Sequence, residues 1–268
     1  MNLNYACGPR SGPPLVLLHG VTRRWQSFLP IMSSLGARWQ VYSLDLPGHG
    51  ESGPNPLGYR VVDYLAPVLK FLRARVGGRA VVYGHSLGSM LAAAVAAEDP
   101  TLVRAVILED PPFETMGERI HSGPLHSYFA ALRPFAGSPL PVAQLWRRLG
   151  EAEAGGVPLR ELRDPVALRF TASCLRKLDP AVLEPILSGE WMDGYHREPI
   201  LRAIQCPALL LQSDPAAGGM LTDEDAAEAE RTMADCLRMR VPSAPHLIHW
   251  YDPAALLRMT HAFLATLD

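Results

Sequence analysis

The sequence predicts an α/β protein with a mostly parallel sheet flanked by helices and a helical segment inserted after the strand that ends near Leu108. Two observations lead to this fold class. Short, unbroken apolar runs such as 15–18 and 103–108 are typical of parallel strands that are covered on both faces. Longer stretches with apolar residues at helical spacing lie between these runs, so strands and helices alternate along the chain.

The bulk composition limits the partners of the protein. With 268 residues, 48% of them hydrophobic, the chain is long enough to bury a core as one domain with an insertion. The formal charge of −2 and the scattered basic residues argue against a nucleic-acid partner. No apolar run reaches the length of a membrane span, so no membrane partner is expected.

The location is predicted from the amino terminus and the cysteines. The first residues lack a basic region followed by a long apolar stretch, so no signal peptide is predicted. The 4 cysteines stand far apart and match neither a zinc site nor a disulfide-rich scaffold. The expected location is therefore the reducing cytoplasm. The oligomeric state is left open.

The first part of the chain alternates between short strands and helices. Strands are predicted at 3–6, 15–18, 40–44 and 81–83, and helices at 25–35, 59–76 and 90–98. Two boundaries have clear causes. The proline- and glycine-rich stretch that follows the first strand cannot continue it, and Gly77-Gly78 ends the 59–76 helix.

The second part of the chain contains the insertion. The strand at 103–108 ends in Glu109-Asp110 and two prolines, which put the acids at the rim of the sheet. Beyond them, prolines and glycines punctuate short helical stretches without an alternating strand pattern. Strands follow at 206–212 and 237–241, and helices at 222–233, with Thr222 as N-cap, and from Pro253 onward. We expect a core of residues 1–111 and 203–268 and a helical cap of residues 112–202.

One turn in this pattern carries a candidate nucleophile. Ser86 stands between an apolar strand and an alanine-rich helix, in Gly84-His85-Ser86-Leu87-Gly88. Such a turn needs unusual backbone angles, and side chains at its two glycines would crowd the helix against the strand. Ser86 is therefore expected to stand above the sheet. The N–H of Leu87, at the helix N-terminus, is then available to a developing negative charge.

Four motifs stand in an order known from one superfamily. They are Leu-Val-Leu-Leu-His-Gly at 15–20, Leu-Asp-Leu-Pro-Gly-His-Gly-Glu-Ser at 44–52, Gly-His-Ser-Leu-Gly at 84–88, and Ala-Pro-His around His246. The chain thus resembles the α/β-hydrolase superfamily over nearly its whole length outside the insertion. The resemblance implies a serine hydrolase in which Val21 donates a second oxyanion N–H beside that of Leu87. It also implies a structural role for Asp45 and His49.

The resemblance places the catalytic histidine on the loop between the last strand and the final helix. His246 has that place, and His249, three residues later, is the alternative. A histidine has the pKa needed to take the serine proton during attack. Because the family's last motif has an acid and a proline several residues after the catalytic histidine, as Asp252 and Pro253 are here, we predict His246 as the base.

The acid of the triad has two candidates. In most relatives it lies a few residues past the strand predicted at 206–212, but that position holds Ala216 here, two residues after Asp214. A minority of the superfamily keeps the acid at the end of the preceding strand, which corresponds to Asp110. We therefore predict Asp110, with Asp214 as the alternative. Glu109 should point to the opposite side of the strand end.

Together these residues predict a cofactor-free serine hydrolase that cleaves an ester, lactone or related acyl bond of a small organic substrate. Ser86 would attack the carbonyl, His246 would transfer the proton and Asp110 would orient the imidazole. Carbon–carbon bond hydrolases, perhydrolases and lyases use the same triad and remain alternatives. A non-catalytic ligand-binding member of the fold is another. No spacing of histidines and acids predicts a metal site.

Overall fold

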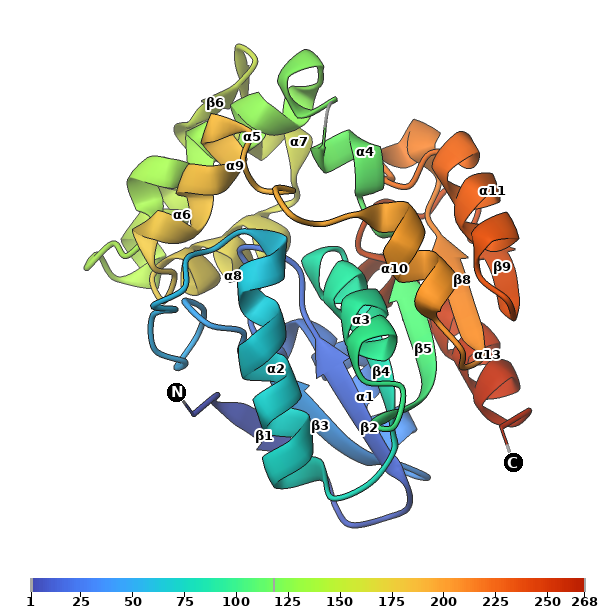
Figure 1. Cartoon of the computed structure of the whole chain (residues 1–268). Helices are drawn as coiled ribbons and strands as arrows, with labels where there is room; N and C mark the ends of the chain where they lie inside the picture. Colours follow the sequence, from blue (N-terminus) through green and yellow to red (C-terminus); the bar gives the residue numbers. More distant parts are fainter. Residues whose placement is uncertain (1, 118, 268) are drawn as a thin grey trace.

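A mostly parallel sheet forms the centre of the protein (Figure 1). The computed structural model describes residues 2–117 and 119–267, and within them the main sheet has seven strands in the order β1-β3-β2-β4-β5-β8-β9. The strands are β1 (Tyr5–Cys7), β2 (Pro14–Leu18), β3 (Gln40–Leu44), β4 (Ala80–His85), β5 (Val103–Glu109), β8 (Ala208–Gln212) and β9 (Cys236–Arg240). β1 pairs antiparallel with β3, and the remaining pairs are parallel. The predicted fold class is confirmed.

The register brings the ends of the central strands together. Leu18 of β2 lies opposite Gly84 of β4, and His85 lies opposite Glu109 of β5. Because these strands are parallel, the loops that leave their carboxyl ends start at one edge of the sheet. That edge is where open α/β sheets bind their ligands.

Helices cover both faces of the sheet. Alternate residues of each central strand join opposite apolar clusters, so Val16 packs on one face and Leu17 on the other. One face carries α1 (Leu29–Gly36), α12 (Ile248–Tyr251) and α13 (Pro253–Leu264). The other carries α2 (Leu65–Phe71), α3 (Leu87–Glu98), α10 (Arg197–Ala203) and α11 (Asp223–Thr232). The unbroken apolar runs of the strands follow from this burial on both faces.

A group of short helices lies between β5 and β8 and forms the upper left part of Figure 1. Its elements are α4 (Phe113–Met116), α5 (Pro124–Leu132), α6 (Val142–Glu151), β6 (Glu153–Ala154), β7 (Val157–Pro158), α7 (Leu159–Leu162), α8 (Pro165–Leu175) and α9 (Glu184–Ser188). The buried side chains of α5 and α6 belong to the same apolar cluster as those of α3. The insertion is therefore packed onto the sheet domain through a shared core.

Three local features differ from the sequence-based expectation. The insertion contains the small hairpin β6-β7, which turns at Gly155 and Gly156 with φ of +60° and +81°. Strands this short show no alternating pattern. The helix expected at 59–76 consists of a 3-10 turn, α2 and a π-helical turn that ends at Gly77 with φ +72°. The helix expected at 25–35 begins as a 3-10 turn, Trp25–Phe28, before α1.

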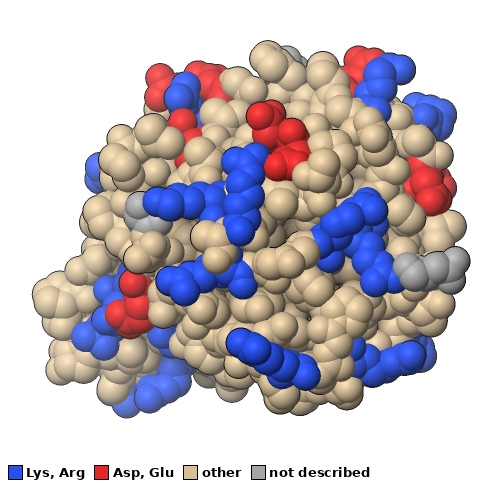
Figure 2. All heavy atoms as spheres, turned by 60° about the horizontal axis from the view of Figure 1, so that its bottom comes forward, with Lys and Arg blue, Asp and Glu red and all other residues tan. Residues whose placement is uncertain are grey.

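The surface and the helix lengths add two observations. On the face drawn in Figure 2, Lys and Arg outnumber Asp and Glu and lie in several groups with uncharged surface between them. In the part of the chain that the structure describes, none of the helices is both long and apolar enough to cross a membrane.

Candidate active site

Ser86 lies at a strained turn between β4 and α3. Its φ of +55° and ψ of −119° are unusual for a residue with a side chain, and Ser86 is the N-cap of α3. A Cβ added to Gly84 would lie 1.9 Å from the Gly88 carbonyl oxygen. A Cβ added to Gly88 would lie 1.9 Å from the Leu18 carbonyl oxygen. The turn that the sequence predicts is present, and only glycine fits at these two positions.

The loop after β2 runs directly beside Ser86. A Cβ on Gly20 would come within 3.0 Å of the Ser86 Cβ. Among the residues that the structure describes, the N–H groups of Val21 and Leu87 have no hydrogen-bond acceptor. These two donors are thus free to bind a ligand oxygen near Ser86.

Two buried histidines support this loop. The Nδ1 of His19 bonds to the Gly20 carbonyl at 2.8 Å, and its Nε2 accepts the Leu46 N–H at 3.0 Å. His49 Nε2 accepts the Thr22 N–H at 3.3 Å. Burial lowers the pKa of His19 to about 4. Burial, followed by the charge of the neighbouring His19, lowers the pKa of His49 to about 3. Both rings are neutral at pH 7 and hold the loop by hydrogen bonds.

Asp110 contacts His246 at the carboxyl edge of the sheet. The Asp110 Oδ2 lies 2.6 Å from His246 Nδ1. The carboxylate also accepts the N–H groups of Ser213, Met220 and Leu221, all from the loop after β8. The loop in which most relatives carry the acid therefore serves here to bind Asp110.

These contacts determine the ionisation of Asp110. Burial is the largest single influence and opposes the charged form. The hydrogen bond and charge of His246, together with the N–H donors of Met220 and Ser213, outweigh burial and lower the pKa of Asp110 below its ordinary value. Asp110 is therefore an anion that accepts a hydrogen bond from the Nδ1–H of His246, which leaves Nε2 of the ring for another partner.

Asp214 lies in a different environment. It is the N-cap of a 3-10 turn, Pro215–Ala217, and accepts the N–H groups of Ala216 and Ser243 and a guanidinium N–H of Arg240. These bonds, the one from Ser243 first, lower its pKa. Asp214 has no contact with His246 among the described residues, so the structure brings the histidine to Asp110.

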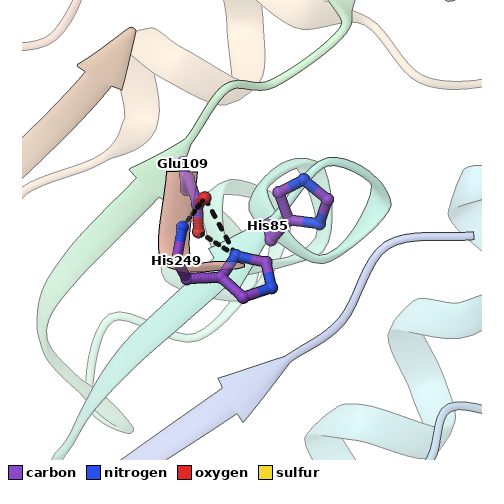
Figure 3. A group of neighbouring side chains, drawn as sticks. All are labelled: His85, Glu109 and His249. Atoms are coloured by element: carbon purple, nitrogen blue, oxygen red, sulfur yellow. Dashed lines mark hydrogen bonds and ion pairs between the residues drawn. The ribbon is translucent and has the colours of Figure 1, made fainter. Parts of the chain in front are cut away.

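His249 is occupied on both ring nitrogens. Its Nδ1 lies 2.8 Å from Glu109 Oε2, and its Nε2 lies 3.0 Å from Ser27 Oγ. Figure 3 shows the ring turned toward Glu109, with His85 beside it. Both His249 and Glu109 are fully buried. Glu109 does lie on the side of the strand end opposite to Asp110, as the sequence predicts.

His246 is linked to the nucleophile turn through His85. The His85 Nε2 lies 3.0 Å from the His246 carbonyl oxygen, and the two rings are 4.6 Å apart between centroids. Because the nitrogen faces a carbonyl oxygen, it must carry the proton. Within the described residues no hydrogen bond joins the Ser86 hydroxyl to His246. In structures without substrate, such bonds are often long or poorly aligned.

Helix α8 of the insertion packs over the loops of the site. Arg23 donates to Thr171 Oγ1 at 2.9 Å, and Arg24 donates to Ser173 Oγ at 3.2 Å. Phe170 stacks on Trp250 with ring centroids 4.8 Å apart. The sequence predicted no role for Arg23 and Arg24. Their position directly after the motif at 15–20 and Val21 is the signal that could have marked them as residues near the site.

A small cleft of about 10 Å³ lies in this contact region, which is room for about one water molecule. Its lining residues are Arg23, Ser27, Arg163, Ala167, Phe170, Thr171, Leu247, Trp250 and Tyr251. Two arginines, Arg23 and Arg163, therefore line a cleft next to the His246 loop. No ion pair involves Arg23 or Arg163 among the described residues.

Comparisons with known proteins agree with this fold. The family described as "alpha/beta hydrolase fold" matches residues 13–162. The chain is 25% identical over 266 residues to a 2-(acetamidomethylene)succinate hydrolase of Mesorhizobium japonicum, covering 95% of this chain and 88% of the relative. It is 25% identical over 245 residues to an N-formylmaleamate deformylase of Pseudomonas putida, covering 90% and 84%. A crystal structure of E-2-(acetamidomethylene)succinate hydrolase, 23% identical, superposes with a TM-score of 0.76 over 98% of this chain and 95% of that one.

Proposed function

Because the chain belongs to the α/β-hydrolase fold family, we propose that it is a serine hydrolase whose catalytic triad is Ser86, His246 and Asp110. The relatives make it a hydrolase of small molecules. The observation that carries the triad is the 2.6 Å contact between Asp110 and His246, on the loop that bonds to the residue before Ser86. The oxyanion donors are the N–H groups of Val21 and Leu87.

The reaction follows from the chemistry of these groups. Nε2 of His246 takes the Ser86 proton while Oγ attacks the substrate carbonyl, and the oxyanion receives the N–H groups of Val21 and Leu87. The imidazolium then protonates the leaving group as the acyl bond breaks. Water, deprotonated by the same histidine, releases the acyl group from Ser86 and restores the hydroxyl. Asp110 keeps the imidazole in the tautomer with the proton on Nδ1.

The bond that is cleaved is an ester, a lactone or a related acyl bond, and the relatives favour an amide. The names of the two relatives contain an acetamido group and an N-formyl group, both of them amides, on molecules that carry carboxylates. Arg23, two residues after Val21 and without an ion pair among the described residues, is a suitable partner for such a carboxylate. The inserted elements from α4 to α9 act as the cap and determine which substrate fits.

A fluorophosphonate probe tests the triad. We expect stoichiometric labelling of the wild-type protein and none of Ser86→Ala, because only an activated serine attacks the phosphorus. Circular dichroism of both proteins controls for folding. An unlabelled wild type with an accessible Ser86 would favour the alternative of a ligand-binding protein without catalysis.

A substrate panel separates the remaining activities. It contains p-nitrophenyl esters of increasing acyl length, lactones, and N-acyl compounds with and without a carboxylate. We expect the highest kcat/KM for a carboxylated substrate, since its anion can bind a guanidinium. If the protein cleaves a carbon–carbon bond of a diketone and turns over none of these compounds, the carbon–carbon bond hydrolase replaces the acyl hydrolase as the proposed function.

A further inference from the structure

A second acid–histidine pair lies behind the proposed triad, and the proposed reaction does not use it. Glu109 and Asp110 are consecutive in the chain, and their partners His249 and His246 are three residues apart on one turn. The side chains of Glu109 and His249 have no exposed surface. A substrate therefore cannot touch this pair, and any role in the reaction must act through another residue.

Glu109 accepts three different donors in this buried place. The backbone N–H of His249 lies 3.0 Å from Oε1, His249 Nδ1 lies 2.8 Å from Oε2, and the Tyr83 hydroxyl donates to Oε2 at 2.6 Å. Burying a carboxylate is costly unless hydrogen bonds and charges compensate it. The carboxylate accepts hydrogen bonds from both the backbone N–H and the ring of His249. It therefore fixes the backbone of this residue as well as the orientation of its ring.

The opposite end of the same turn is held by His85. Its ring lies between the two histidines, with centroids 4.6 Å from that of His246 and 4.9 Å from that of His249. Burial, followed by the charges of these two neighbours, lowers the pKa of His85 well below its ordinary value, so the ring is neutral. Its Nε2–H donates to the His246 carbonyl at 3.0 Å. The turn from His246 to His249 is thus bound at its first carbonyl and at its last N–H.

The three side chains of Figure 3 could also be considered as metal ligands, since their donor atoms lie within 4.8 Å of one another. The contacts argue for hydrogen bonding instead. Glu109 and His249 bond directly to each other, and the second nitrogen of His249 bonds to Ser27. A metal ion bound to His249 would have to displace at least one of the two bonds of its ring.

We propose that Glu109 and His249 are positioning residues that hold His246 in the orientation in which its ring reaches both Asp110 and Ser86. This inference rests on the proposed function, in which His246 is the base. Without the pair, the turn loses its attachment to β5, and the imidazole moves relative to the Ser86 hydroxyl. A displacement of about 1 Å in a catalytic group can reduce a rate about 100-fold.

The first test compares Glu109→Gln and His249→Gln with a control of similar stability. Val41→Ala shortens a buried side chain of β3, a strand that β2 and β4 separate from β5, and it is expected to lower the thermal midpoint. We expect both Gln variants to label with fluorophosphonate about 10- to 100-fold more slowly and to turn over substrate with a lower kcat and an unchanged KM. Val41→Ala should keep its kcat. Equal kcat values in all folded variants would overturn the proposal.

The second test does not need a substrate. A short N–H···O bond between His246 and Asp110 gives a downfield proton resonance, which is assigned by its loss in Asp110→Asn. We expect this resonance to shift or broaden in Glu109→Gln, although Asp110 is intact, and to stay in place in Val41→Ala. An unchanged resonance in Glu109→Gln contradicts the positioning role whether or not the protein is an enzyme. If the wild-type protein is not labelled by fluorophosphonate but the resonance still shifts in Glu109→Gln, the proposed function is refuted and the positioning role is retained.

Discussion

Asp110 combines a strained backbone with a fully buried charge. Its φ of +47° lies in the left-handed region, which Asp and Asn tolerate better than most residues with a side chain. This conformation follows the last residue of β5 and turns the carboxylate toward His246 and the loop after β8. The carboxylate accepts hydrogen bonds from four donors, three backbone N–H groups and His246. Because strained backbone conformations cluster at functional sites, Asp110 is the best candidate for the acid of the triad.

Replacing each candidate acid in turn tests this assignment. Asp110→Asn keeps the shape of the side chain and tolerates the left-handed conformation. An NH₂ group in place of Oδ2, however, cannot accept the hydrogen bond from the Nδ1–H of His246. We expect kcat to fall by about 10⁴-fold. Asp214→Asn should change kcat by less than about 3-fold, since Asp214 bonds to Ala216, Ser243 and Arg240 and has no contact with His246 among the described residues. Steady-state kinetics measure both, and a large loss limited to Asp214→Asn would reverse the assignment.

At the scale of secondary-structure elements, α3 packs closely against β2 and β4. The helix begins immediately after Ser86 and crosses the strands at Gly84 and Gly88, where backbone atoms of neighbouring elements are in direct contact. The short distance between helix and strand keeps the Leu87 N–H close to the loop of Val21. The glycines of this turn are therefore required by packing, independently of any substrate.

Gly88→Ala tests this requirement. The new Cβ would meet the Leu18 carbonyl oxygen at 1.9 Å. Because this oxygen belongs to the buried backbone of β2, we expect a loss of about 3 kcal/mol or more in the free energy of unfolding. Gly36→Ala in α1 is the matched control, since a Cβ there has nothing within 4 Å. It should leave stability unchanged or raise it by up to about 1 kcal/mol. Urea denaturation measures both, and equal stability of the two variants would contradict the packing argument.

At the scale of the whole molecule, several buried histidines affect how stability depends on pH. His19, His49 and His85 lie under the site with pKa values lowered chiefly by burial. In the unfolded chain each of them binds a proton near its ordinary pKa of 6.5, whereas the folded protein excludes it. Between about pH 6.5 and 4 the unfolded state thus binds more protons, so stability falls as pH falls.

We expect the free energy of unfolding to decrease by roughly 1 kcal/mol per pH unit for each of these histidines in that range. Chemical denaturation at pH 7.5, 6 and 5 measures the slope. His49→Asn removes one of the groups and should reduce the slope without abolishing folding, because an amide can still accept the Thr22 N–H. A slope that is the same in the variant would show that His49 titrates alike in both states.

The sequence predicted the strands and the turn of Ser86 because each has a local cause, whereas the place of His246 came from the resemblance to a known family. Apolar runs, glycines at close backbone contacts and helix caps act within a few residues of the chain. Small departures, such as the β6-β7 hairpin and the 3-10 start of the helix at 25–35, occur where elements are too short for periodicity.

Only the tertiary structure decided which acid meets which histidine. Glu109, Asp110 and Asp214 all lie at or just beyond the ends of parallel strands, at one edge of the sheet, and the sequence favours Asp110 but leaves Asp214 as the alternative. One residue along the chain turns a side chain to the opposite face, and this difference sends Asp110 to His246 and Glu109 to His249. Such pairings depend on contacts between residues more than 100 positions apart, which no local pattern contains.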